Sequence, residues 1–241
     1  MKEHIINTFD SLAPIYEHSV DNTSLYNSEY ERPSMLNQLP QDLSGKHILD
    51  AGCAAGWYTE QLILRGARVT ATDVSPNMVA ATKRRVGTQA EVLCADLEEP
   101  LPFAAQSFDF IVSSLTLHYL LEWTPTFDEF QRILKPSGCL LYSVHHPFMD
   151  IKLSKHGDYF TTEQVIDTWK KEGRTFNVPL YRRSLQSILN ETMLHFTVEQ
   201  LIEPQPTNQF KIASAEGYEK LMRNPHFLII KAFRKEGKKR R

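Results

Sequence analysis

Short apolar runs alternate with amphipathic segments along the middle of the chain, between residues 45 and 147. Five runs have the length and composition of buried strands: His47–Gly52, Arg68–Asp73, Ala90–Asp96, Phe108–Leu115 and Cys139–Val144. Segments with apolar residues at helical spacing lie between them, at Trp57–Arg65, Pro76–Val86 and Thr126–Leu134. Because strands that alternate with helices pair in parallel through crossovers, this pattern predicts a doubly wound α/β sheet.

The flanking segments break this alternation. Residues 1–44 combine aromatic residues with prolines and predict a cap of short helices, which either covers a sheet edge or closes over an active site as a lid. Residues 148–184 are polar and aromatic without a clear period, so we expect an insertion beside the sheet. Residues 185–235 predict a helix and the last two strands of the same domain, which would form an antiparallel edge on the parallel sheet.

Composition and charge narrow the class of protein. With 41% hydrophobic residues and a net charge of −2, the 241-residue chain has the balance of a soluble globular protein and no overall field for nucleic acid. The basic tail at 236–241 is expected to be a solvated chain end. No apolar run reaches membrane-spanning length, the N-terminus lacks a signal-peptide core, and the cysteines are widely spaced, at Cys53, Cys94 and Cys139. We therefore expect a cytoplasmic protein without disulfides, a metal site or membrane insertion.

The loop after the first predicted strand reads Asp-Ala-Gly-Cys-Ala-Ala-Gly and ends at Gly56. Gly52 and Gly56 carry no Cβ, so we expect the backbone to approach a ligand closely here, at the strand end where open α/β sheets bind ligands. A dinucleotide fingerprint starting at Gly52 would need glycine at positions that hold Ala54 and Trp57. Asp50 has little reason to face a pyrophosphate, but it suits an ammonium group. The loop therefore indicates a nucleoside with an amino-acid tail.

Aspartates also end the second and third predicted strands, at Asp73 and Asp96. A carboxylate at the end of the second strand accepts hydrogen bonds from ribose hydroxyls, and we predict this role for Asp73. Asp96 is predicted to accept a hydrogen bond from the exocyclic amine of adenine, and Val74, Met78 and Leu97 to form apolar walls around the base. A single aspartate at a strand end is more often a helix cap or a loop contact, but three at successive strand ends favour a binding site.

Five segments carry a resemblance to a known family: Ile48–Gly56, Ala71–Met78, Ala95–Phe103, Ser107–Leu115 and Leu134–Gly138. In this order they resemble the class I S-adenosylmethionine-dependent methyltransferases, in particular the group that includes the ubiquinone and menaquinone biosynthesis methyltransferases. The resemblance implies a seven-stranded sheet with a reversed final hairpin, and S-adenosyl-L-methionine bound across the strand tips. Ala54 departs from the family, which usually has glycine at this position.

The resemblance also implies cofactor contacts from the N-terminal segment. Tyr16 and Arg32 are expected to touch the cofactor, Arg32 through the methionine carboxylate, although packing under a helix is the more common role of such tyrosines. Together with the loop and the strand ends, the predicted cofactor-binding set is Tyr16, Arg32, Asp50, Gly52, Ala54, Gly56, Asp73, Val74, Met78, Asp96, Leu97 and Ser113.

Methyl transfer from a sulfonium is an in-line displacement with an activated donor, so the protein mainly aligns the nucleophile with the methyl group and excludes water. A general base is needed only when the acceptor loses a proton. Near the tips of the fourth and fifth strands, the residues that suit this role are His118, Tyr119, His145 and His146. We select His118 and His146 as the catalytic residues, with hydrogen bonding to the backbone as the alternative. Adjacent histidines on a strand point to opposite faces, which argues against a metal site.

The segment after the fourth strand also bears on the acceptor. Enzymes that methylate amino groups of adenine or glutamine resemble one another in an Asp/Asn-Pro-Pro-Tyr motif here, whereas this chain reads Val-Ser-Ser-Leu-Thr over 112–116. Its absence favours a small-molecule acceptor, and the aromatic insertion at 148–184 would roof a pocket for an apolar or planar molecule. The alternatives are a nicotinamide-dependent oxidoreductase and a non-catalytic nucleoside-binding protein of the same fold.

Overall fold

The computed structural model describes residues 2–235, and the predicted basic tail at 236–241 lies outside the described residues. Its main sheet has seven strands in the order β3-β2-β1-β4-β5-β9-β8. Their bounds are β1 His47–Ala51, β2 Arg68–Asp73, β3 Ala90–Cys94, β4 Phe108–Ser114, β5 Leu134–His145, β8 Phe196–Ile202 and β9 Phe227–Arg234. The first five pair in parallel, and β9 runs antiparallel to both β5 and β8. The predicted fold class is thereby confirmed.

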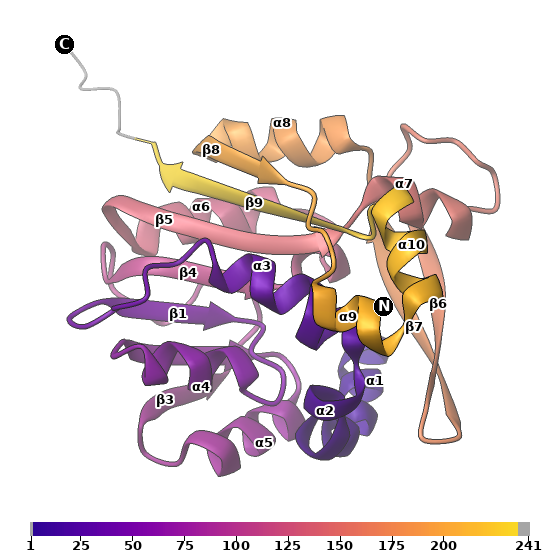
Figure 1. Ribbon diagram of the computed structural model, residues 1–241. Coiled ribbons are helices and arrows are strands. Elements are labelled where there is room, and N and C mark those ends of the chain that lie inside the picture. Colours follow the sequence, from indigo (N-terminus) through magenta and orange to yellow (C-terminus); the bar gives the residue numbers. More distant parts are fainter. Residues whose placement is uncertain (1, 236–241) are drawn as a thin grey trace.

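Helices cover both faces of this sheet (Figure 1). One face packs against α3 Arg32–Leu36, α4 Trp57–Leu64 and α5 Pro76–Val86, and the other against α6 Thr124–Ile133 and α8 Leu185–His195. Successive strand residues point to opposite faces, so Ile48 joins the first layer and Leu49 the second. Burial on both faces explains why these strands appear in the sequence as nearly continuous apolar runs.

Local sequence signals set the helix ends. The hydroxyl of Ser75 accepts a hydrogen bond from the Met78 amide at 3.1 Å, and Pro76 occupies the first turn of α5. This is the N-cap that the sequence predicts, because serine satisfies a free amide where proline needs none. Within residues 2–235, no helix combines the length and apolar character that crossing a membrane would require.

Several further elements gather at the carboxyl ends of the parallel strands (Figure 1). They include α1 Lys2–Ile15, α2 Asp21–Thr23, α7 Pro147–Asp150, α9 Asn208–Ala213, α10 Ala215–Arg223 and the antiparallel pair β6 Glu163–Lys171 and β7 Arg174–Arg182. The sequence predicts an insertion at 148–184 but not this hairpin. Every second residue of β6 points inward, but these positions hold Asp167 and Lys171 as well as Val165 and Trp169. The alternation of apolar and polar residues that is typical of a strand is therefore interrupted.

Candidate active site

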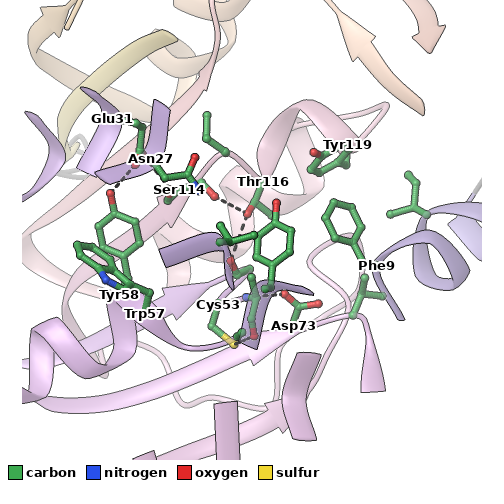
Figure 2. Close-up of a pocket in the computed structure, with 18 of the residues that line it drawn as sticks. Phe9, Asn27, Glu31, Cys53, Trp57, Tyr58, Asp73, Ser114, Thr116 and Tyr119 are labelled. Atoms are coloured by element: carbon green, nitrogen blue, oxygen red, sulfur yellow. Dashed lines mark hydrogen bonds between the residues drawn. The ribbon is translucent and has the colours of Figure 1, made fainter. Parts of the chain in front are cut away.

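A cavity of about 610 Å³ lies at the carboxyl ends of the parallel strands, within the roughly 300–1,000 Å³ usual for small-molecule sites. Its wall combines the loop after β1, the ends of β2 to β5, the N-terminal helices and the β6–β7 hairpin. Figure 2 shows Trp57 and Tyr58 on one side of it and Phe9 and Tyr119 on the other. Eight residues of the predicted cofactor set line it: Tyr16, Arg32, Gly52, Ala54, Asp73, Val74, Asp96 and Leu97.

The two loop glycines are required by the protein's own packing. Both have positive φ, +84° at Gly52 and +81° at Gly56, which favours glycine. A Cβ on Gly52 would overlap the side chain of Thr116, and one on Gly56 would lie 2.8 Å from Cγ2 of Thr82. We expected glycine at these positions because a Cβ would occupy space that a ligand needs. That reason is wrong, because the side chains of Thr116 and Thr82 fill this space. Gly52 lines the cavity, whereas Gly56 does not.

Asp73, at the end of β2, holds the loop in place and also faces the cavity. Its two carboxylate oxygens accept hydrogen bonds from the amides of Ala54 and Ser75, each at 2.9 Å. Burial raises the pKa of Asp73 to about 6. At neutral pH the carboxylate is thus mostly ionised, and it lines the wall at the strand end where a ribose is expected.

Asp96 and Leu97 follow β3 in the same wall, next to Val74 after β2. The ammonium group of Lys2, from the start of α1, pairs with the carboxylate of Asp96. These residues place a carboxylate and apolar side chains at the position predicted for a base. The N-terminal segment therefore reaches the same part of the cavity as the strand ends.

Three other members of the predicted set lie behind the wall. Asp50 is buried and accepts a hydrogen bond from the Thr59 hydroxyl at 2.6 Å, and burial raises its pKa to about 7. Met78 is fully buried in the contact between α1 and α5. Ser113 donates to the Ala51 carbonyl at 2.8 Å, joining β4 to β1. Because none of them reaches the cavity wall, their predicted direct contacts with a cofactor are not supported, and their visible role is to hold the loop and strands.

Glu31 is not among the predicted site residues, yet it lies in the cavity wall although its side chain is buried. Its carboxylate accepts a hydrogen bond from the Tyr58 hydroxyl at 2.7 Å (Figure 2) and two more from the hydroxyls of Ser114 at 2.9 Å and Ser143 at 2.5 Å. Burial raises the pKa of Glu31, while these three hydroxyls oppose the rise. A buried acid that ties the N-terminal segment to β4, β5 and α4 has no local sequence signal, since its partners are distant along the chain.

Arg32, next to Glu31, carries an unused donor. Its guanidinium lies 4.0 Å above the Trp57 ring, and Nη2 donates to Asp21 at 2.7 Å. Within residues 2–235, Nη1 is buried without a hydrogen-bond partner. A buried unpaired donor is costly, and because Arg32 lines the cavity, an anionic ligand that reached its guanidinium would satisfy this donor. Tyr16 lines the same cavity, and burial raises the pKa of its phenol to about 12.

Neither of the predicted catalytic histidines belongs to the cavity wall. His118 is buried, both ring nitrogens lack partners among the described residues, and burial holds its pKa well below its ordinary value. His146 caps α7, where Nδ1 accepts from the Phe148 amide at 3.1 Å. Direct contact between either ring and an acceptor is therefore not supported by the structure. His145, from the end of β5, does line the cavity.

The β6–β7 hairpin and α1 close the side of the cavity away from the sheet. Asp167, Trp169 and Lys171 of β6 line it, and the indole of Trp169 donates to Asp167 at 2.7 Å. Phe9 of α1 packs edge-on against Tyr119, with ring centroids 5.0 Å apart. Within residues 2–235, no group of three or more His, Cys, Asp or Glu side chains is arranged to hold a metal ion.

Comparisons with known proteins agree with this architecture. Residues 49–142 match the sequence model of a family described as a methyltransferase domain. The chain is similar to the biotin biosynthesis bifunctional protein BioHC of Cellvibrio japonicus, with 35% identity over 50% of this chain and 24% of that protein. It is also similar to the malonyl-[acyl-carrier protein] O-methyltransferase of Serratia marcescens, with 35% identity over 41% of this chain and 38% of that protein. The chain thus spans well under half the length of these two relatives.

Among solved structures, an S-adenosylmethionine-dependent methyltransferase from Mesorhizobium loti superposes with a TM-score of 0.68. The two share 27% sequence identity over 85% of this chain and 97% of that one. The matched segment contains the loop after β1 and the ends of β2 to β4, which are the parts of the fold that build the nucleoside side of the cavity. On this evidence residues 49–142 form a methyltransferase domain of the class I S-adenosylmethionine-dependent kind, and its cofactor is S-adenosyl-L-methionine.

Proposed function

We propose that the protein transfers the methyl group of S-adenosyl-L-methionine to an oxygen atom of a small-molecule acceptor by in-line displacement. The observation that carries this proposal is the continuity of the cavity. Strand-end carboxylates for a nucleoside and aromatic side chains for an acceptor line the same 610 Å³ space. Methylation of oxygen is the form that the name of the Serratia marcescens relative supports.

Several residues present in the wall fit the cofactor. Asp73 offers an ionised carboxylate for the ribose hydroxyls, and Asp96 with Leu97 offers an acceptor and an apolar surface for the adenine. The guanidinium of Arg32, which lines the cavity, is the group we propose for the methionine carboxylate. When bound, S-adenosyl-L-methionine supplies an activated methyl group, so the chain's own task is to align the acceptor and keep out water.

The elements that line the cavity opposite the sheet support a small acceptor. We propose that residues 1–44 act as a lid and residues 148–184 as a roof over the acceptor, because α1 and the β6–β7 hairpin both line the cavity. The roof presents Trp169 and Tyr181 beside Tyr119, surfaces on which an apolar or planar molecule stacks.

Two experiments test the proposal. Calorimetric titration with S-adenosyl-L-methionine, S-adenosylhomocysteine and NADH in parallel should show binding of the first two only. A panel of phenols, carboxylic acids and amines, offered with methyl-labelled donor, should then yield an O-methylated product. Binding of NADH alone would favour an oxidoreductase instead. Binding of S-adenosylhomocysteine without transfer to any panel member would favour a non-catalytic binding protein.

A further inference from the structure

His145 and Asp150 form a pair at the far end of the cavity from the nucleoside groups. Along the sheet order β3-β2-β1-β4-β5, Asp96 and Asp73 follow β3 and β2, whereas His145 ends β5. Neighbouring strands lie about 4.8 Å apart, so β5 is roughly 14 Å from β2. The loop after β1, where the two halves of the cavity meet, lies between them. His145 is thus placed on the acceptor side of the site.

The local fold holds the Asp150 carboxylate beside the His145 ring. Nδ1 of His145 lies 3.1 Å from Oδ1 of Asp150, and both side chains are about nine-tenths buried. The chain leaves β5, turns through the single helical turn α7 and brings residue 150 back beside residue 145. The cap of α7 by His146 and the bond from the Asp150 amide to the His146 carbonyl, at 3.2 Å, hold this turn.

The other nitrogen of His145 is left without a partner in a residue that lines the cavity. The described residues give Nε2 no hydrogen bond, and it is not fully buried as the two nitrogens of His118 are. The His118 ring stacks on the His145 ring at 4.4 Å, and Phe227 of β9 packs 6.0 Å away. With Asp150 accepting from Nδ1–H, neutral His145 presents the lone pair of Nε2 to whatever occupies the acceptor compartment.

We propose that His145, oriented by Asp150, is the general base of the reaction and that the acceptor is a hydroxyl compound, such as a phenol or an enol. This deepens the proposed function and rests on it. A carboxylate acceptor is already ionised at neutral pH and needs no base, so a buried His–Asp pair facing the acceptor fits a hydroxyl group. As the O–H bond breaks, the proton passes to Nε2. The oxygen's electron pair forms the bond to the methyl carbon while the carbon–sulfur pair stays on sulfur, and the imidazolium is left paired with Asp150.

The charges around His145 agree with this role. The groups that face it are His118 of the short 3-10 turn at Leu117–Tyr119, Asp150 of α7, Asp167 of β6 and His226 beside β9. Burial lowers the pKa of His145, but the charge and hydrogen bond of Asp150, with the charge of Asp167, outweigh burial and leave that pKa raised. Burial lowers the pKa of His226 to about 3 and that of His118 well below its ordinary value. Of these three histidines, only His145 has a raised pKa.

The test compares His145→Gln and Asp150→Asn with a matched control. His195 pairs with Asp128 at 3.2 Å, a similar histidine–carboxylate contact that lies outside the cavity wall, so His195→Gln breaks the same kind of pair elsewhere. Phenol and catechol, which keep their protons at neutral pH, serve as hydroxyl acceptors. We expect turnover of the His145 variant to fall by about 100-fold or more, the usual share of a general base, with unchanged affinity for S-adenosylhomocysteine. His195→Gln should keep wild-type turnover.

The pH profile separates a base from a structural residue. Wild-type turnover should rise with pH through an inflection above the ordinary histidine pKa, and Asp150→Asn should move this inflection to lower pH. Turnover of the His145 variant within about threefold of wild type, or methylation confined to carboxylic acids or amines, would overturn the inference while leaving the methyltransferase function intact. Failure of wild type to bind S-adenosylhomocysteine would instead overturn the proposed function.

A readout without turnover completes the test. Titration of labelled histidines by NMR, with S-adenosylhomocysteine present, should give His145 a raised pKa and the proton on Nδ1 when neutral. Asp150→Asn should lower that pKa, whereas His195→Gln should not. If no acceptor yields product, this titration decides: a pKa at or below the ordinary value, or a proton on Nε2, contradicts the inference.

Discussion

The amide of Ala54 donates a 2.9 Å hydrogen bond to the carboxylate of Asp73, so the loop after β1 is fastened to the end of β2. The loop is fastened from its other side by the Thr82 hydroxyl, which donates to the Ala54 carbonyl at 2.6 Å. Ala54 adopts a φ of +47° in this position, in the left-handed region that favours glycine. The loop therefore keeps its shape through two specific hydrogen bonds despite a strained alanine.

Replacing this alanine should stabilise the protein. Ala54→Gly relieves a left-handed conformation that costs about 1–2 kcal/mol for residues with a Cβ, and loses part of this gain to the greater freedom of glycine in the unfolded chain. We expect the free energy of unfolding to rise by up to about 1 kcal/mol, measured by urea denaturation. Ala55→Gly is the control, because buried Ala55 has no positive φ and its replacement should lower stability. Equal losses of stability in Ala54→Gly and Ala55→Gly would contradict backbone strain at Ala54.

Cofactor affinity should depend on the ionisation of Asp73. Asp73→Asn removes a charged acceptor and should weaken S-adenosylhomocysteine binding by roughly 1.5–3 kcal/mol, or about 10- to 100-fold, in calorimetry at pH 7.5. Asp109→Asn, which changes a carboxylate outside the cavity wall, should leave the affinity unchanged. Equal affinity of the Asp73 variant and wild type would show that this carboxylate makes no contact with the ribose.

The same carboxylate should make binding pH-dependent. Because burial raises the pKa of Asp73 to about 6 in the unliganded protein, lowering the pH through this value protonates it and removes an acceptor. Wild-type affinity for S-adenosylhomocysteine should therefore fall between pH 7 and pH 5. Over the same range the affinity of Asp73→Asn should stay nearly flat, and a parallel decline in both proteins would assign the dependence to another group.

Ionisation of the buried Asp50 carboxyl should lower the free energy of unfolding at neutral pH. Burial raises its pKa to about 7, against about 3.9 in an unfolded chain. Its contribution to folding is therefore fully present below about pH 4 and is lost as the pH rises through about 7. We expect Asp50→Asn to raise the free energy of unfolding by roughly 1–3 kcal/mol at pH 8 and to lose most of this advantage at pH 4.5, in urea denaturation at both pH values.

Asp109 supplies the control of opposite sign for this experiment. Its burial favours the neutral form, but hydrogen bonds from the His47 amide at 2.9 Å and from Lys135 at 2.6 Å outweigh it and lower the pKa of Asp109. Its stabilising contribution is present at neutral pH and is lost on acidification. Asp109→Asn should thus lower stability at pH 8. If Asp50→Asn lowers the free energy of unfolding at pH 8, the ionised carboxylate of Asp50 stabilises the folded protein.

Cofactor binding should depend on the planar shape of the Arg32 guanidinium as well as on its charge. Arg32→Lys keeps the charge but loses the planar group that stacks on Trp57 and the free Nη1 donor. We expect affinity for S-adenosylhomocysteine to fall about 10-fold, or roughly 1.4 kcal/mol, the scale of one charged hydrogen bond. Arg84→Lys changes an exposed arginine paired with Glu17 and should have no effect on binding. If both variants bind equally well, Nη1 is not satisfied by the cofactor.

The order of elements and the nucleoside side of the site follow from the sequence alone. Buried parallel strands leave continuous apolar runs, Ser75 and Pro76 mark a helix start, and Asp73 and Asp96 stand where strands end, so each signal is local. Local patterns also carry the resemblance to the methyltransferase family. These features need only a few neighbouring residues to be recognised, which is why their predicted positions agree with the fold.

Tertiary structure decided which side chains reach the cavity. Glu31 meets Ser143 across 112 positions of chain, a contact for which no local pattern exists. Asp50 and His118 occupy strand-end positions that the sequence marks as functional, yet packing turns both away from the cavity wall. Among the adjacent histidines 145 and 146, only the geometry of α7 shows that the first is paired with Asp150 and faces the cavity while the second caps the helix. Sequence determines which residues lie at the strand ends, and the direction of each side chain depends on what the rest of the chain packs against it.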